Sequence, residues 1–82
     1  MLKAIILEDE KIHLDALKTK IREFCPEIEV VSDFVSVPEA LEQIPLIHFD
    51  LMFLDVRVGD MTAFDLLAKL PRFSFHIIFV SA

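Results

Sequence analysis

The chain has 82 residues, 55% of them hydrophobic and 27% charged, which allows one folded domain and excludes a disordered tail. Its formal charge of −6 and pI near 4.8 argue against direct contact with nucleic acid, whose phosphates require clusters of Lys and Arg. No apolar run approaches the roughly 18 residues of a membrane span, and the N-terminus has no signal peptide. A single cysteine, Cys25, cannot form an internal disulfide, which is typical of proteins in the reducing cytoplasm. We therefore expect a cytoplasmic protein, and the lack of a long apolar run predicts no membrane contact.

The first half of the chain alternates apolar runs with a segment of helical periodicity. Lys3–Leu7 and Ile28–Val31 are predicted strands, the second with one wetter face, as in an edge strand. The helix predicted between them, over about residues 10–24, carries apolar side chains near helical spacing at Leu14, Leu17, Ile21 and Phe24.

The second half repeats this alternation. Ser36–Glu39 reads as a capping box that begins a helix ended by Pro45. Leu51–Leu54 is apolar throughout, which predicts a central strand covered on both faces. Ala63–Leu70 is predicted to be a third helix, and Phe75–Val80 a fourth strand.

Strands that alternate with helices predict an α/β fold with a parallel sheet. For one domain of this size, residues 1–82, we expect a flavodoxin-like doubly wound parallel sheet of order 2-1-3-4. Such a fold does not normally finish on an apolar strand, so we interpret the chain as a domain truncated after its fourth strand.

In the expected sheet the strand order reverses between strands 1 and 3, which is the switch point. Ligand sites of open parallel sheets lie at the switch point, beyond the carboxyl ends of the strands. Glu8, Asp9 and Glu10 follow the first strand, and Asp55 follows the third. Converging carboxylates suit Mg2+, although the run at residues 8–10 is also typical of a solvated loop that begins a helix. Asp55 is harder to explain in that way, because it follows four apolar residues.

Other polar residues at strand ends are weaker candidates. Asp50 begins the strand that Asp55 ends, roughly 16 Å away at about 3.3 Å per residue, so it cannot join the site. Asp33 ends strand 2, roughly 10 Å from strand 3. Ser81 follows strand 4, next to strand 3, and its hydroxyl could face whatever Asp55 carries.

Three segments together resemble the receiver domain of two-component response regulators: Ala4–Glu10, Asp50–Asp55 and His76–Ala82. The resemblance runs from residue 1 to residue 82. The sequences of predicted strands 1 and 4 are similar to those of receivers that precede LytTR-type DNA-binding domains. It implies that a sensor histidine kinase phosphorylates Asp55, and that a C-terminal output domain, for example a DNA-binding one, responds.

The resemblance also implies roles for the other site residues. Glu8 and Asp9 would correspond to the acidic pair that holds Mg2+, with Asp55 and the Arg57 backbone carbonyl as further ligands. Ser81 would be the switch hydroxyl, and Arg57 is either a surface residue or a cation that pairs with a site carboxylate when no metal is bound.

The sequence also departs from the family. Val58, Gly59 and Ala63 stand where receivers usually have Met-Pro and a later Gly. In the family, a Lys that binds the phosphoryl group lies on a fifth strand, which this chain does not include. We therefore expect poor phosphotransfer by the 82-residue form, and its self-association through the open, apolar edge of strand 4.

The predicted function is a phosphorylated signalling switch with self-catalysed transfer only, not an enzyme. The alternative is a phosphorylation-independent interaction or dimerisation module of the same fold. A haloacid-dehalogenase-like phosphatase would need a second Asp at the position of Arg57. The histidines His13, His48 and His76 have no metal-ligand spacing, and the eight Phe residues indicate core packing.

Overall fold

Four parallel strands form the main sheet in the computed structural model, which describes residues 1–58, 61–70 and 74–80. The strands are β1 (Leu2–Leu7), β2 (Ile28–Phe34), β3 (Leu51–Asp55) and β6 (His76–Val80). Their spatial order, β2-β1-β3-β6, confirms the predicted order 2-1-3-4.

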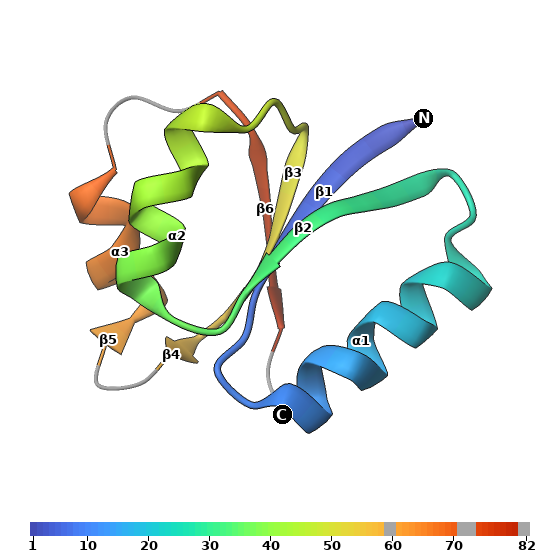
Figure 1. The fold of residues 1–82 in the computed structure, drawn as a ribbon, viewed down its shortest axis with the longest axis horizontal. Helices are drawn as coiled ribbons and strands as arrows, with labels where there is room; N and C mark the ends of the chain where they lie inside the picture. The colour runs from blue at the N-terminus through green and yellow to red at the C-terminus, as the bar shows by residue number, and fades with distance from the viewer. Residues whose placement is uncertain (59–60, 71–73, 81–82) are drawn as a thin grey trace.

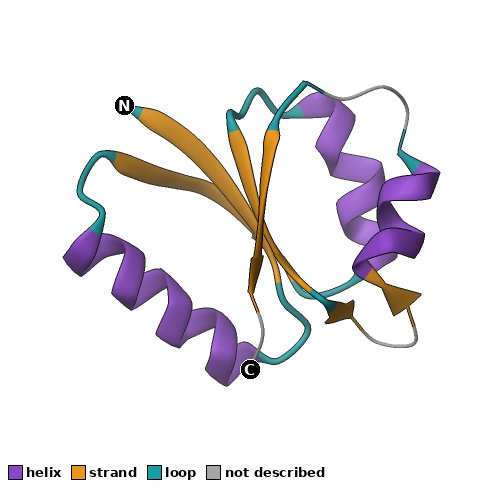
Figure 2. Ribbon diagram, turned by 180° about the vertical axis from the view of Figure 1, so that it is seen from behind, coloured by secondary structure: helices purple, strands orange, loops and turns teal. Residues whose placement is uncertain are grey.

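Helices cover both faces of this sheet (Figures 1 and 2). Helix α1 (Lys11–Phe24) lies on one face. Helices α2 (Val37–Gln43) and α3 (Ala63–Lys69) lie on the other, and a short 3₁₀ turn, η1 (Ile44–Leu46), extends α2. Pro45 therefore lies within this turn, one residue after its start. No helix in the described part of the chain is long and apolar enough to cross a membrane.

The core consists of two apolar layers, because successive strand residues point to opposite faces. Against α1 the sheet buries Ala4, Ile6, Leu51 and Phe53. Against α2 and α3 it buries Ile5, Leu7, Met52 and Leu54. This double burial explains why β1 and β3 are apolar at consecutive positions, as a central parallel strand must be.

Two elements differ from the sequence prediction. Strand β2 continues three residues past Val31, through Ser32 and Asp33 to the buried Phe34, since an edge strand tolerates half-exposed polar side chains. Phe24, predicted on the buried stripe of α1, is 77% exposed. At about 100° per residue it lies roughly 80° from Leu14 around the helix, which is the margin of that stripe.

Helix capping also differs from the prediction. Ser36 is the N-cap of α2, but its side chain makes no cap hydrogen bond, so the predicted capping box was wrong. The donor that a capping box would use is the Glu39 N–H, and it makes no bond to the Ser36 side chain. A capping box occurs instead at α3, where the Asp65 N–H donates to Thr62 Oγ1 (3.2 Å) and the Thr62 N–H to Asp65 Oδ2 (3.0 Å).

A small hairpin follows Asp55. Strands β4 (Arg57–Val58) and β5 (Met61–Thr62) pair antiparallel and connect β3 to α3. Val56 precedes the hairpin, and its N–H donates to the Val80 carbonyl at 3.3 Å. The Val56 carbonyl accepts from the Ala63 N–H at 2.7 Å, so the segment after Asp55 is bonded to both β6 and the start of α3.

Candidate metal centre

Three carboxylates meet at the carboxyl ends of β1 and β3. Leu7 and Leu54 are paired in register, so the residues after them emerge side by side. Glu8, Asp9 and Asp55 each offer a carboxylate oxygen, and these oxygens all lie within 4.8 Å of one another. The structure thus brings together the acidic side chains that were predicted to converge at the switch point.

Glu8 is the buried member of this group, with 5% of its surface exposed. Its N–H donates to the Phe34 carbonyl at 3.0 Å, and its Oε1 accepts from the Glu10 N–H at 3.0 Å. Burial raises the pKa of Glu8, and contacts with the Asp55 and Asp9 carboxyls raise it further, while the Glu10 N–H opposes the change. In the metal-free site, burial and the neighbouring carboxyls therefore disfavour the charged form of Glu8.

These donors fit Mg2+. The ion prefers one or two carboxylates together with several waters, and it dehydrates reluctantly. Asp55 is half-buried and Asp9 is exposed, so two carboxylates can contact an ion on a side that water reaches. A divalent cation would also offset the mutual repulsion that three close carboxylates create.

The pairing of the hairpin shows how the backbone of Arg57 is bonded. Arg57 pairs with Thr62, and the Ala63 N–H bonds to the Val56 carbonyl, so Arg57 and Thr62 form a non-hydrogen-bonded pair. Their backbone groups point away from the partner strand, and the Thr62 N–H accordingly donates to a side chain. The hairpin therefore leaves the Arg57 carbonyl out of its own ladder. Ser81, the predicted switch hydroxyl, lies outside the described residues.

Asp50 and Asp33 lie away from the three carboxylates, as expected. Asp50 precedes β3 at the opposite end of that strand, and its Oδ2 accepts from the Lys3 N–H at 2.8 Å. Asp33 lies near the end of β2, where its Oδ2 is 2.9 Å from Lys18 Nζ. Both side chains have partners of their own.

The sequence reasoning missed the place of His13. Its Nδ1 lies 3.5 Å from a Glu10 carboxylate oxygen and 3.9 Å from Glu8 Oε1. Glu10 is the N-cap of α1, and its carboxylate, which is not among the three grouped ones, lies next to His13, three residues on. That i, i+3 spacing at a helix start was the available signal.

Comparison with known proteins points to one class. No family model matches the chain. The response regulatory domain of protein mrkE from Klebsiella pneumoniae superposes with a TM-score of 0.83 and 25% identity, over 99% of this chain and 67% of that one. A CheY-like receiver domain from Methylobacillus flagellatus gives a TM-score of 0.76 at 23% identity, over 99% of this chain and 70% of that one. The fold and these neighbours show that the chain belongs to the receiver domains of response regulators.

Relatives in sequence narrow the class. "Sensory transduction protein LytT" from Bacillus cereus is 32% identical over 66 residues, which are 80% of this chain and 26% of the relative. "Sensory transduction protein LytR" from Staphylococcus epidermidis is 31% identical over 83 residues, covering 99% of this chain and 32% of the relative. The chain thus spans about a quarter to a third of these curated relatives, and it is similar to that part of LytT and LytR.

Proposed function

We propose that Asp55 is the phosphoacceptor of a switch controlled by a sensor histidine kinase. A carboxylate oxygen of Asp55 attacks the phosphorus of a kinase phosphohistidine, the P–N bond breaks, and an acyl phosphate forms as the imidazole leaves. The observation that carries this proposal is the position of Asp55, at the end of a buried strand and with two further carboxylates within 4.8 Å.

Mg2+ is the proposed cofactor. Asp9, Asp55 and the Arg57 carbonyl would hold the ion together with water, and Glu8 would orient Asp9 and Asp55 from its buried position. A bound divalent cation supplies charge neutralisation for a transferring phosphoryl group. In the metal-free protein, Glu8 holds the loop through its bonds to Phe34 and Glu10.

The output steps belong to the same proposal. Ser81 would turn its hydroxyl toward the phosphoryl group, and an output domain C-terminal to residue 82 would respond. RcsB from Salmonella enterica serovar Typhimurium, which shares the fold (TM-score 0.79, 16% identity), was solved bound to a promoter with the phosphomimetic BeF3−. By analogy with that structure, we propose a DNA-binding output domain. The net charge of −6 supports a receiver that does not itself contact nucleic acid, and we propose a cytoplasmic location.

Phosphotransfer can be tested by labelling the full-length protein with acetyl phosphate and Mg2+, followed by intact mass measurement. The parent should gain one phosphoryl group, and Asp55→Asn should gain none. Asp50→Asn makes the same chemical change at the other end of the strand and should label like the parent. Equal labelling of Asp55→Asn and the parent would show that another residue accepts the group.

Arg57 offers a second test of the site. A cation two residues from Asp55 would compete with a metal ion for the carboxylates of the site. Arg57→Ala should therefore tighten Mg2+ binding at low salt, where charge effects are least screened. Unchanged or weaker binding in a calorimetric titration would contradict a competing role for this side chain.

Exposed apolar side chains favour one alternative, a phosphorylation-independent interaction module. Ile78 and Phe79 of β6 are 43% and 47% exposed, and Phe64 of α3 is 69% exposed beside Phe79. An interaction module would retain its partner binding in Asp55→Asn and without Mg2+. A switch would lose the phosphorylation-dependent part of that binding.

A further inference from the structure

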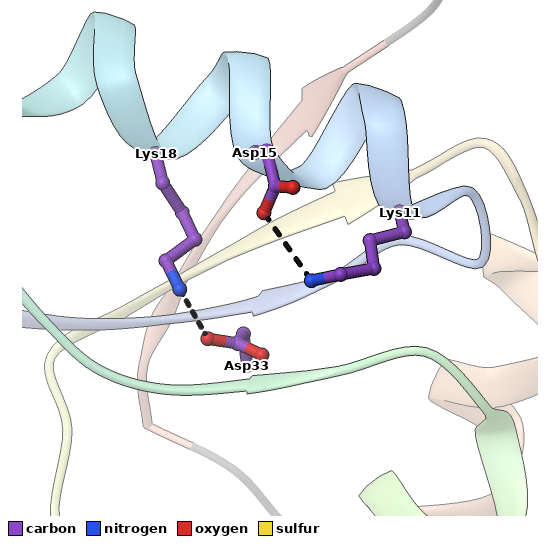
Figure 3. Close-up of polar contacts among 4 residues, drawn as sticks. All are labelled: Lys11, Asp15, Lys18 and Asp33. Carbon is purple, nitrogen blue, oxygen red and sulfur yellow. Dashed lines mark hydrogen bonds and ion pairs between the residues drawn. The ribbon is translucent and has the colours of Figure 1, made fainter.

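Two Lys–Asp ion pairs lie along α1, and they differ in what they connect (Figure 3). Lys11 Nζ lies 3.6 Å from Asp15 Oδ1, one turn along the same helix, and these side chains are 80% and 59% exposed. Lys18 Nζ lies 2.9 Å from Asp33 Oδ2, and these side chains are 39% and 34% exposed. The first pair is local to α1, whereas the second connects α1 to β2 and therefore constrains how the helix lies on the sheet.

Asp33 precedes the residue that holds Glu8 in place. In the sheet Asp33 is aligned with Ile6 and Phe34 with Leu7. The Phe34 carbonyl then accepts the Glu8 N–H at 3.0 Å. The end of β2 thus carries both the anchor of the acidic loop and the carboxylate that binds Lys18.

The other end of the acidic loop is fixed to α1. The Glu10 carbonyl accepts from the Leu14 N–H at 2.9 Å, and the Glu10 N–H donates to Glu8 Oε1 at 3.0 Å. Residues 8–10 are therefore held between the end of β2 and the first turn of α1. A shift of α1 relative to β2 would move Glu8 and Asp9 relative to Asp55.

We propose that Lys18 and Asp33 are positioning residues for the three-carboxylate site, which they serve by fixing α1 against β2. The inference rests on the proposed function, because Mg2+ is the cation whose binding reports the spacing of these carboxylates.

Direct charge effects make the opposite prediction for one of the two residues. If Lys18 acted only through its charge, Lys18→Met would remove a competing cation and tighten Mg2+ binding, while Asp33→Asn would weaken it. Loss of positioning weakens Mg2+ binding in both variants. The double variant keeps the parent's net charge, so a charge effect leaves binding unchanged, whereas a positioning effect leaves it as weak as in either single variant.

The experiment titrates the full-length parent and these three variants with Mg2+ and follows the amide chemical shifts of residues 8–10. We expect binding up to about fivefold weaker in each variant, which is the upper range for a half-exposed ion pair. The charge-swapped variant, Lys18→Glu with Asp33→Lys, should recover most of the loss. The matched control, Lys11→Met with Asp15→Asn, should bind Mg2+ like the parent, since its ion pair lies within one helix.

A second measurement needs no metal. Amide hydrogen exchange of Glu8, bonded to Phe34, should be faster in Lys18→Met and Asp33→Asn than in the parent and the control. Tighter Mg2+ binding by Lys18→Met, or a double variant that matches the parent, would overturn the positioning role. A parent that binds no Mg2+ would overturn the proposed metal site instead, and unchanged exchange of Glu8 would then overturn the positioning role separately. Thermal unfolding of each variant identifies any that fails to fold, and Lys18→Arg, which keeps the ion pair, should then bind Mg2+ like the parent.

Discussion

Replacing Asp55 by Asn removes one carboxylate from the site and keeps the shape of the side chain. We expect the metal-free protein to become more stable, because the variant removes the charge of one of three carboxylates that lie close together. The Asn side chain can still form a hydrogen bond with Glu8, so the variant changes the charge and little else.

The magnitude follows from the distances. Two unit charges 4.8 Å apart repel by about 3.5 kcal/mol at an effective dielectric constant of 20, and by about 0.9 kcal/mol in bulk water. Asp9 is exposed, so solvent screening reduces the repulsion below the first of these two values. We therefore expect a gain of about 1–2 kcal/mol in the free energy of unfolding, or about 5–10 °C in Tm for a domain of this size.

The assay is thermal unfolding with and without Mg2+. At about tenfold excess of Mg2+ over its Kd the parent should gain about 1.4 kcal/mol, and the variant much less, so the two melting temperatures should converge. Asp50→Asn is the control, since its side chain lies at the opposite end of β3 and accepts a hydrogen bond from Lys3 that Asn can also accept. A metal-free Asp55→Asn protein less stable than the parent, or one equally stabilised by Mg2+, would refute this reasoning.

Three further predictions concern the rest of the chain. Burial, followed by the contact with Asp55, raises the pKa of Glu8 above its usual 4.5, so the folded protein holds this proton more tightly than the unfolded chain. The contribution of this proton to the free energy of unfolding is complete below about pH 4.5 and is lost as the pH rises through the pKa of Glu8 in the folded protein. The metal-free parent should therefore lose stability relative to Glu8→Gln as the pH rises through that range. A difference in Tm that does not change with pH would contradict this. Thr62→Ala removes the cap of α3 and should lower the stability by about 1 kcal/mol, whereas Thr62→Ser should not, and equal Tm values would show that the cap contributes nothing. The 82-residue chain should self-associate along β6, an edge of the described sheet where Ile78 and Phe79 are exposed, and light scattering from a stable monomer at micromolar concentration would exclude this.

The main sheet could be predicted because its signals are physical and local. The continuous apolar runs of β1 and β3 have one simple explanation, which is burial on both faces of a parallel sheet. The rule that sites lie at the switch point then indicated that Asp55 would meet Glu8 and Asp9 while Asp50 would not. The spacing of strand ends was sufficient for this, and no side-chain detail was needed.

Other features depend on interactions that periodicity does not carry. The strands of the hairpin after Val56 have two residues each, which is too short for an alternating pattern. The capping box predicted at Ser36 and the one observed at Thr62 follow similar sequence patterns, so the pattern alone does not decide which of the two forms the reciprocal hydrogen bonds. The approach of His13 to Glu8 depends on how α1 begins, which tertiary packing decides.

Val56 gives Asp55 a direct mechanical connection to two other elements. Its N–H is bonded to Val80 at the end of β6, and its carbonyl is bonded to the N–H of Ala63 at the start of α3. A movement of the Asp55 backbone that carried Val56 with it would strain both bonds at once. Chemical modification of Asp55 would therefore reach the β6 edge and α3 together, through one residue and without a rearrangement of the core.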